Sequence, residues 1–447
     1  MALLNWLFGW PLATAEEERH RVGTIAGIPT LGLDALASAA YGPEAALTIL
    51  LVLGTAGLGY IGPITLLIVG LLFIVYLSYR QTIAAYPSGG GSYTVAKDNL
   101  GIRSGLLAAA ALMIDYVLVV AVGISAGVGA LVSAVPNLQP YTLILCLVIL
   151  GVIAAVNLRG TRESGLAFAL PTYLFIISLL GILAVGLWKV IATSGHPVPV
   201  DSPPAMPPGT EAVGLWVLAK AFASGCTAMT GVEAVSNGVA AFREPPVKFA
   251  RRTLTAIILI LGVLLIGIAY LCRAYGIGAT EPGKEGYESV LSQLVAAVAG
   301  RGVVYYVTIG GVLAVLALSA NTGFADFPRL CRAVAQDGFL PSGFAHRGRR
   351  LVYTRGILLI TVLAGGLLIA FGGLTDNLIP LFAVGAFLAF TLSQAGMVAH
   401  WLRVGGRGSR VAAVVNGAGA VGTAAALAVV LVAKFADGAW VTVALLA

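Results

Sequence analysis

Charged residues are scarce in this chain: Asp, Glu, Lys and Arg make up 10% of its 447 residues, against roughly 25% in an average soluble domain. Apolar residues make up 59%, and the mean hydropathy is +0.97. So few charges cannot cover a soluble fold with polar surface. The composition therefore excludes an ordinary soluble protein and predicts an integral membrane protein.

Cysteine and histidine are also scarce, with four residues of each. The cysteines lie in or beside apolar segments without paired spacing, at Cys146, Cys226, Cys272 and Cys331. This spacing indicates packing residues and excludes a disulfide framework or a metal cluster. Gly89–Gly91 lacks the Gly-Lys-Ser/Thr ending of a phosphate loop, and no nucleophile–base pair is evident elsewhere. We therefore expect no enzymatic activity and no resident cofactor.

The first 23 residues lack the basic start, apolar run and cleavage site of a secretory signal. Trp6, Phe8 and Trp10 are typical of a segment that lies on the bilayer surface. We therefore expect residues 1–23 to form a cytoplasmic or interfacial N-terminal segment.

Long apolar segments then follow one another along the chain. They fall at roughly 24–53, 60–79, 105–134, 141–157, 166–192, 214–240, 253–273, 302–321, 355–372, 379–401 and 411–434, and a twelfth begins near Ala436. A short helix outside the membrane is predicted over 287–300. The pattern predicts an all-α protein with twelve transmembrane helices, the twelfth cut short at Ala447.

Basic residues favour one orientation of these spans. If the N-terminus is inside, most Lys and Arg residues between spans fall on the inner side, including Arg80, Arg159 and Arg347. Because inner loops carry an excess of Lys and Arg, we expect a multi-pass protein of the plasma (inner) membrane with a cytoplasmic N-terminus. The same distribution accounts for the net charge of +7 without a nucleic-acid partner.

The first span carries polar residues and a helix breaker at membrane depth. Asp34 and Tyr41 lie seven residues apart, so they share a face of a continuous helix. Gly42-Pro43 is predicted to interrupt the helix. Glu44 follows Pro43 directly, which is typical of a helix start, so we interpret Glu44 as a capping acid.

The sixth span repeats this arrangement in the opposite direction. Residues 223–233 combine glycines, hydroxyls and Glu233 in mid-membrane. Interrupted helices at matching positions of two opposed halves are typical of inverted-repeat transporters of the LeuT type. We therefore predict discontinuous helices 1 and 6, a first five-helix repeat at 24–192, an inverted second repeat at 214–401, and helices 11 and 12 at 411–447.

Acids inside membrane spans are functional more often than structural. Asp34 and Asp115 are candidate cation ligands, and Ser125 lies near the face of Asp115. The alternative for each is a structural hydrogen bond between helices. Glu233 is the best candidate for a proton carrier, with a paired structural acid as its alternative. Asn321-Thr322-Gly323 closes the eighth span and is interpreted as a C-terminal helix cap.

Several stretches together resemble the amino acid–polyamine–organocation (APC) superfamily, and more closely the KimA-type branch of the KUP potassium/proton symporters. They are Asp34-Ala35-Leu36, Ala40-Tyr41-Gly42, Ser78-Tyr79-Arg80-Gln81, Tyr86-Pro87, Gly89-Gly90-Gly91, Ser224-Gly225-Cys226, Thr230-Gly231-Val232-Glu233-Ala234, Ala320-Asn321-Thr322-Gly323-Phe324 and Thr391-Leu392-Ser393-Gln394. The resemblance implies a twelve-helix fold and proton-driven import of potassium by alternating access.

Carried over by position, the resemblance also implies a set of site residues. Potassium would be bound by Asp34, Tyr41, Asp115, Ser125 and Thr230, with Glu233 as the proton-linked acid. Two positions depart from the family pattern: Val119 replaces a threonine and Phe382 replaces a tyrosine. Each departure removes an oxygen ligand.

The departures leave a second function open, an amino acid or amine/proton symporter on the same fold with Val119 and Phe382 as walls for an organic side chain. A channel is disfavoured, since no repeated carbonyl-filter sequence is present. The expected partners are membrane lipid and a transported cation, amine or amino acid. The sequence also leaves a homodimer open.

Overall fold

A computed structural model describes residues 21–89, 91–159, 164–281, 284, 286–348, 352–435 and 440–446. All regular elements in these ranges are helices, apart from one isolated bridge between Val22 and Phe242. The all-α prediction is therefore confirmed for the described part of the chain. The N-terminal segment predicted at 1–23 lies almost wholly outside the described residues, as does the predicted start of the twelfth span near Ala436.

The helices before the long loop at 193–214 agree closely with the apolar segments. They are α2 (Thr24–Leu31), α3 (Leu33–Leu50), the 3-10 helix η2 (Leu51–Gly57), α4 (Leu58–Ala85), α5 (Ser92–Leu100), α6 (Ile102–Ala134), η3 (Pro136–Tyr141), α7 (Thr142–Arg159) and α8 (Ser164–Ala192).

The helices after this loop do the same. They are α9 (Leu215–Gly225), η4 (Cys226–Met229), α10 (Ala234–Asn237), η5 (Val239–Ala241), α11 (Pro246–Tyr275), α12 (Val290–Ala299), α13 (Val303–Gln336), η6 (Ser342–Phe344), α14 (Thr354–Ala370), α15 (Thr375–Leu378), α16 (Val384–Val404), α17 (Arg407–Lys434) and α18 (Trp440–Leu446). The short helix predicted over 287–300 is present as α12, and its predicted place outside the membrane stays a prediction.

Eight helical stretches among the described residues are long and apolar enough to cross a membrane. One of them, Leu33–Ala85, is 53 residues long, although about 20 residues suffice for one crossing. Gly54 interrupts it with φ +59° inside η2, a left-handed conformation that glycine adopts without steric cost. This stretch is therefore long enough for two spans joined at Gly54.

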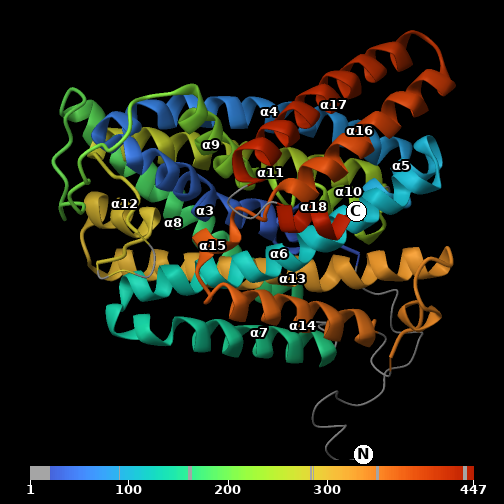
Figure 1. The fold of residues 1–447 in the computed structure, drawn as a ribbon, viewed down its shortest axis with the longest axis horizontal. Helices are drawn as coiled ribbons and strands as arrows, with labels where there is room; N and C mark the ends of the chain where they lie inside the picture. The colour runs from blue at the N-terminus through green and yellow to red at the C-terminus, as the bar shows by residue number, and fades with distance from the viewer. Residues whose placement is uncertain are drawn as a thin grey trace, which may run out of the picture.

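The helices pack in layers that are visible in Figure 1. The two longest helices, α6 and α13, run side by side, and α7 and α14 cover them on one side. On the other side lie α3, α8, α9, α11 and α4, while α16 and α17 form a pair that projects from the molecule. The candidate acids are buried between these layers: Asp34 lies on α3, Asp115 on α6 and Glu233 just before α10.

The interruption predicted at Gly42-Pro43 is wrong, because α3 runs through both residues. Proline removes only one hydrogen bond of a helix, and the packed surroundings keep the helix intact. Gly42 serves close packing instead, since a Cβ there would lie 2.5 Å from the Cβ of Ala228. The helical run breaks earlier, at Gly32 between α2 and α3, where φ is −112° and ψ is 1°.

The sixth apolar segment contains a non-helical stretch. Helix α9 ends at Gly225 and leads into η4, Thr230 is extended with ψ 156°, and Gly231 has φ +79°. Helix α10 then begins at Ala234. The backbone of this stretch makes short turn hydrogen bonds in place of regular helical ones, from Thr230 N to Thr227 O at 3.5 Å and from Ala234 N to Gly231 O at 3.3 Å.

The C-terminal cap predicted at Asn321-Thr322-Gly323 is wrong, because α13 continues to Gln336. Gly323 is a packing residue: a Cβ there would lie 2.8 Å from the carbonyl oxygen of Tyr116 on α6. Asn321 accepts a hydrogen bond from Asn157 on α7, with 2.8 Å between Oδ1 and Nδ2. These contacts join α13 to α6 and α7. The cap was misplaced because the apolar segment ends near residue 321, whereas the helix continues to Gln336.

Candidate functional site

The first and sixth apolar segments meet at Tyr41 and Thr230. The Tyr41 hydroxyl lies 3.2 Å from Oγ1 of Thr230, and both residues are buried. Thr230 also donates to the carbonyl of Thr227, at 3.1 Å. Two hydroxyls and a non-helical turn of backbone are thereby brought together in the protein interior.

Asp34 lies against Gly231, the residue that follows Thr230 in the same turn. It belongs to the first turn of α3, where the helix N-terminus stabilises a negative charge, and only 2% of its surface is exposed. A Cβ on Gly231 would lie 2.5 Å from Asp34 Oδ2 and 2.7 Å from the backbone nitrogen of Ala35. The carboxyl group can occupy this position because residue 231 is glycine.

Asp115 is fully buried on α6. Neither of its carboxyl oxygens receives a hydrogen bond of normal geometry from a described residue, although the backbone N–H of Ala386 in the first turn of α16 interacts with the group. Burying an ionised carboxylate without donors costs several kcal/mol or more. The position therefore suits a carboxyl group that binds a cation or a proton.

Glu233 follows the non-helical stretch and is 1% exposed. Its Oε2 atom has no hydrogen-bond donor among the described residues. The charge of Glu233 acts on both Asp34 and Asp115. Asp34 on α3, Asp115 on α6 and Glu233 just before α10 thus form one electrostatically linked group of buried acids.

Ser125 lies apart from this group. It is ten residues beyond Asp115 on the same helix, which corresponds to about 15 Å along the axis. Its Oγ accepts a hydrogen bond from Thr375 Oγ1 at 3.1 Å, and it lines a separate cavity with Thr375 and Tyr287. Asp115 and Ser125 therefore cannot bind one ion together.

Glu44 does not start a helix, so its interpretation as a cap of its own helix is wrong. It lies within α3, where its Oε1 accepts from the Tyr287 hydroxyl at 3.0 Å and its Oε2 accepts from the backbone nitrogen of Val290 at 3.2 Å. Val290 is the first residue of α12, so Glu44 caps a helix that is distant in the sequence.

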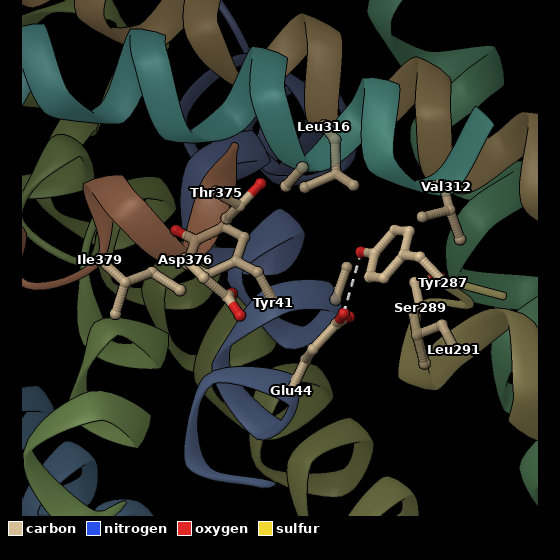
Figure 2. Close-up of a pocket in the computed structure, with 13 residues that line it drawn as sticks. Tyr41, Glu44, Tyr287, Ser289, Leu291, Val312, Leu316, Thr375, Asp376 and Ile379 are labelled. Atoms are coloured by element: carbon tan, nitrogen blue, oxygen red, sulfur yellow. Dashed lines mark hydrogen bonds between the residues drawn. The ribbon is translucent and has the colours of Figure 1, made fainter. Parts of the chain in front are cut away.

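A second cavity is lined by Glu44 and Tyr41. Figure 2 shows Glu44, Asp376 and Tyr287 projecting toward one space beside Tyr41. Oδ2 of Asp376 is buried without a hydrogen-bond donor from the described part of the chain. This cavity and the one that Ser125 lines share Tyr287 and Thr375.

The two positions that depart from the family pattern are buried. Val119 is 2% exposed and Phe382 is fully buried. The Phe382 ring lies 6.3 Å from the Tyr41 ring, centroid to centroid. An apolar wall thus lies beside Tyr41.

Asp326 and Asn237 were missed by the sequence reasoning. Asp326 lies on α13 with 5% of its surface exposed, and its charge acts on Asp34 and Glu233. Asn237 donates to the Tyr116 hydroxyl at 2.8 Å. The signal that could have identified Asp326 is its place in Phe324-Ala325-Asp326-Phe327, an apolar run beyond the predicted end of the eighth span.

A polar contact outside the spanning helices involves Asp337. Its carboxylate lies 2.7 Å from Nζ of Lys97 and accepts a hydrogen bond from the Tyr93 hydroxyl. These hydrogen bonds, first from Lys97 and then from Tyr93, hold the pKa of Asp337 below its usual value. The contact joins α5 to the end of α13.

Comparison with known proteins agrees with this architecture. The family model described as amino acid permease matches residues 31–445. The potassium transporter KimA of Bacillus subtilis (strain 168) is 41% identical over 438 residues, covering 97% of this chain and 70% of the relative.

Two more distant relatives carry organic substrates in their names. The branched-chain amino acid permease BcaP of Lactococcus lactis subsp. cremoris (strain MG1363) is 24% identical, over 72% of this chain and 70% of its own. The low-affinity putrescine importer PlaP of Escherichia coli (strain K12) is 22% identical, over 75% and 72%. The family model spans nearly all of the sequence, and the chain belongs to the amino acid permease family.

Proposed function

We propose that this chain takes up potassium in symport with protons by alternating access. The observation that carries the proposal is its 41% identity, over 97% of its length, to a protein named as a potassium transporter. The buried Asp115 carboxyl without normal hydrogen-bond donors supports a cation as the substrate.

The proposed membrane arrangement has twelve spans, with the cytoplasmic N-terminus that the positive-inside rule favours. The spans form two inverted repeats, at 24–192 and 214–401, followed by helices 11 and 12 at 411–447. The breaks that would permit alternating access are the one at Gly32 and the one at 226–233. Their apposition, through Asp34 and Gly231, supports helices 1 and 6 as the moving discontinuous pair.

The proposed ion site combines residues of α3, α6 and the non-helical stretch between η4 and α10. Asp34, Tyr41 and Thr230 would supply oxygens at the break, and Asp115 would supply a charge from α6. Ser125 and Thr375 line one cavity. Ser125 would bind the ion there, before the ion reaches Asp34 and Asp115. Glu233 would hold the coupled proton, since it adjoins both acids and has an oxygen that lacks a described donor.

The driving force follows from charge. An inside-negative membrane potential favours cation uptake by about 2.3 kcal/mol per charge per 100 mV. A proton that enters with the potassium ion adds a second charge and the free energy of the pH gradient. The positive charges of the potassium ion and the proton would also offset the negative charges of Asp34, Asp115 and Glu233.

An amino acid or amine/proton symporter is the second candidate. The Phe382 ring beside Tyr41 and the buried Val119 offer an apolar wall where the related symporters have oxygen ligands. The relatives BcaP and PlaP are named as an amino acid permease and a putrescine importer, which also supports an organic substrate. Asp34 or Asp115 would then pair with an ammonium group of the substrate.

Uptake into proteoliposomes separates the candidates. Radioactive rubidium, leucine and putrescine are presented with and without an inward proton gradient, to vesicles with the protein and to empty vesicles. The proposal predicts rubidium uptake that the gradient increases, and no uptake of the organic compounds. Gradient-driven leucine or putrescine uptake without rubidium uptake would establish the second candidate, and rubidium uptake that ignores the gradient would contradict proton coupling.

A further inference from the structure

Asn237 joins the inner half of the sixth segment to two helices of the facing layer. It is the last residue of α10, one helical turn after Glu233, and the proposed topology puts it on the cytoplasmic side of that acid. Its Nδ2 atom donates to the Tyr116 hydroxyl at 2.8 Å, and its side chain also acts as a hydrogen-bond donor to the Asp326 carboxyl. Because Tyr116 lies on α6 and Asp326 on α13, one amide group connects three elements.

The loop between α4 and α5 packs on the same residue. A Cβ on Gly89 would lie 2.8 Å from the carbonyl oxygen of Asn237, and a Cβ on Gly91 would lie 2.9 Å from its Oδ1 atom. Gly89 also has φ +101°, a conformation that glycine adopts without steric cost. These glycines, whose sequence does not match a phosphate loop, therefore allow the loop to lie directly against Asn237. The proposed topology puts this loop at the cytoplasmic face.

The inner half of the first segment contacts the next residue of the sixth. A Cβ on Gly238 would lie 2.9 Å from Cδ2 of Leu31, and Leu31 is the last residue of α2, directly before the break at Gly32. The backbone nitrogen of Asn237 donates to the Glu233 carbonyl at 3.0 Å. A displacement of Asn237 therefore acts on the backbone that carries Glu233.

The two sides of the candidate site differ in packing. On the side that the proposed topology makes the outer one, Tyr41 and Glu44 line a cavity. On the cytoplasmic side, Asn237 bonds to Tyr116, which is 2% exposed, and the loop that carries Gly89 and Gly91 covers Asn237. An ion that leaves the buried acids for the cytoplasm has to part these contacts.

We propose that Asn237 is the positioning residue of an inner gate, which closes the cation site from the cytoplasm. The gate is closed by the contacts of Asn237 with Tyr116 and Asp326 and by the loop that lies against it. It opens when the inner half of the sixth segment moves away from α6 and α13, which breaks the bond between Asn237 and Tyr116. This inference rests on the proposed function, because a gate requires transport by alternating access.

A static joint between helices is the competing explanation, and a reversible cross-link separates the two. A Cβ at residue 91 would lie 3.5 Å from Cγ of Asn237, so Gly91→Cys combined with Asn237→Cys places two thiols within reach of a disulfide. The four native cysteines are buried and are left in place. A static joint stays closed throughout the transport cycle and tolerates the bond, whereas a gate that cannot open stops transport.

The experiment measures rubidium uptake by the full chain in proteoliposomes before oxidation, after oxidation and after addition of a reductant. For the double variant we expect uptake to fall by about tenfold or more on oxidation and to recover on reduction. The single variants Gly91→Cys and Asn237→Cys are the controls, and their uptake should change by less than about twofold.

Rubidium should still stabilise the cross-linked protein against thermal unfolding, because the outer side stays open to the ion. Cross-linked protein that transports at its reduced rate would overturn the inference, and so would a pair of thiols that does not form the disulfide.

A second variant tests the gate without cysteines, and it decides the matter should the double variant not fold. Tyr116→Phe keeps the ring and removes the hydroxyl that accepts from Asn237. A weaker closed state should raise the ratio of the half-saturating rubidium concentration outside to that inside by about two- to tenfold. Tyr86→Phe is the matched control, because its hydroxyl accepts from Asn99 Nδ2 at 2.7 Å and not from the sixth segment. An unchanged ratio in Tyr116→Phe, or an equal change in both variants, overturns the inference.

Failure of the gate and failure of the proposed function give different results. A wild-type protein that takes up none of rubidium, leucine and putrescine refutes the proposed function, and the gate with it. Wild-type rubidium uptake together with undiminished uptake by the cross-linked variant refutes only the gate.

Discussion

The hydroxyl of Tyr41 lies 3.2 Å from the hydroxyl of Thr230, although 189 residues separate them in the chain. The contact joins the middle of α3 to the extended residue that follows η4. Tyr41 also lines the cavity that contains Glu44 and Asp376. The same residue therefore lines the cavity of Glu44 and contacts the non-helical stretch of the sixth segment.

Removal of the Tyr41 hydroxyl should weaken rubidium binding and leave the fold intact. Tyr41→Phe deletes one oxygen and keeps the ring that packs beside Phe382. The loss of one ligand or hydrogen bond of about 1.4 kcal/mol corresponds to a tenfold rise in the KM for rubidium. Uptake kinetics measure it, with Tyr60→Phe, which lies on α4, as the matched control; an unchanged KM would remove Tyr41 from the site.

Neutralisation of Asp115 should stabilise the protein while it abolishes transport. Asp115→Asn removes a buried charge that lacks described donors of normal geometry, and the amide oxygen can still accept from the start of α16. We expect the free energy of unfolding to rise by about 1–3 kcal/mol in potassium-free buffer.

Thermal unfolding with and without potassium measures this effect. At a hundredfold excess over its dissociation constant, potassium should add about 2.7 kcal/mol to wild-type stability and nothing to the variant. An Asp115→Asn protein that potassium still stabilises, or that still takes up rubidium, would contradict the role of Asp115.

A side chain at residue 231 should displace Asp34. Gly231→Ala places a Cβ 2.5 Å from Asp34 Oδ2 at φ +79°, so both the backbone and the carboxyl must move. We expect a loss of about 1–3 kcal/mol in stability and loss of rubidium uptake. Gly181→Ala on α8 is the control, since nothing lies within 4 Å of a Cβ there; equal effects of the two substitutions would refute the close contact.

The Lys97–Asp337 contact should make stability depend on pH. Hydrogen bonds lower the pKa of Asp337 in the folded state, so its contribution is present above the unfolded pKa of about 4 and disappears as the pH falls through the folded value. The Lys97 and Asp337 side chains are 29% and 32% exposed, and for such a partly exposed pair we expect about 0.5–1 kcal/mol.

Asp337→Asn should therefore unfold at a lower temperature than wild type at pH 7, and the difference should shrink as the pH drops below 4. Calorimetry or tryptophan fluorescence in detergent at several pH values measures it. A difference that grows on acidification would contradict the assigned direction of the pKa shift.

The sequence predicted the helices well, because their signal is local. Apolar length alone located α6 and α11 to within a few residues at one end, and the polar interruption of the sixth segment was visible in its glycines and hydroxyls. The break in the first segment was misplaced, because proline is a strong local signal while Gly32 has no distinguishing neighbour. Whether a proline breaks a helix depends on packing that the sequence does not reveal.

The site shows the same limit. Asp34, Asp115 and Glu233 were recognisable as acids in apolar surroundings, and the structure brings their charges together. Glu44 and Asp326 were misjudged or missed because their partners, Tyr287 and Asn237, are distant in the sequence. Ser125 lies near the face of α6 that carries Asp115, but about 15 Å along the helix axis separates the two residues, so they do not belong to one ion site.

The central claim is that buried acids at the junction of the first and sixth segments couple a cation to a proton. It is tested most directly by the internal pH of proteoliposomes after external potassium is added with the membrane potential held at zero. Wild-type vesicles should acidify, Glu233→Gln vesicles should take up rubidium without acidifying, and Asp34→Asn vesicles should do neither. Rubidium uptake by the wild type with a constant internal pH, or acidification by Asp34→Asn equal to wild type, would contradict the account.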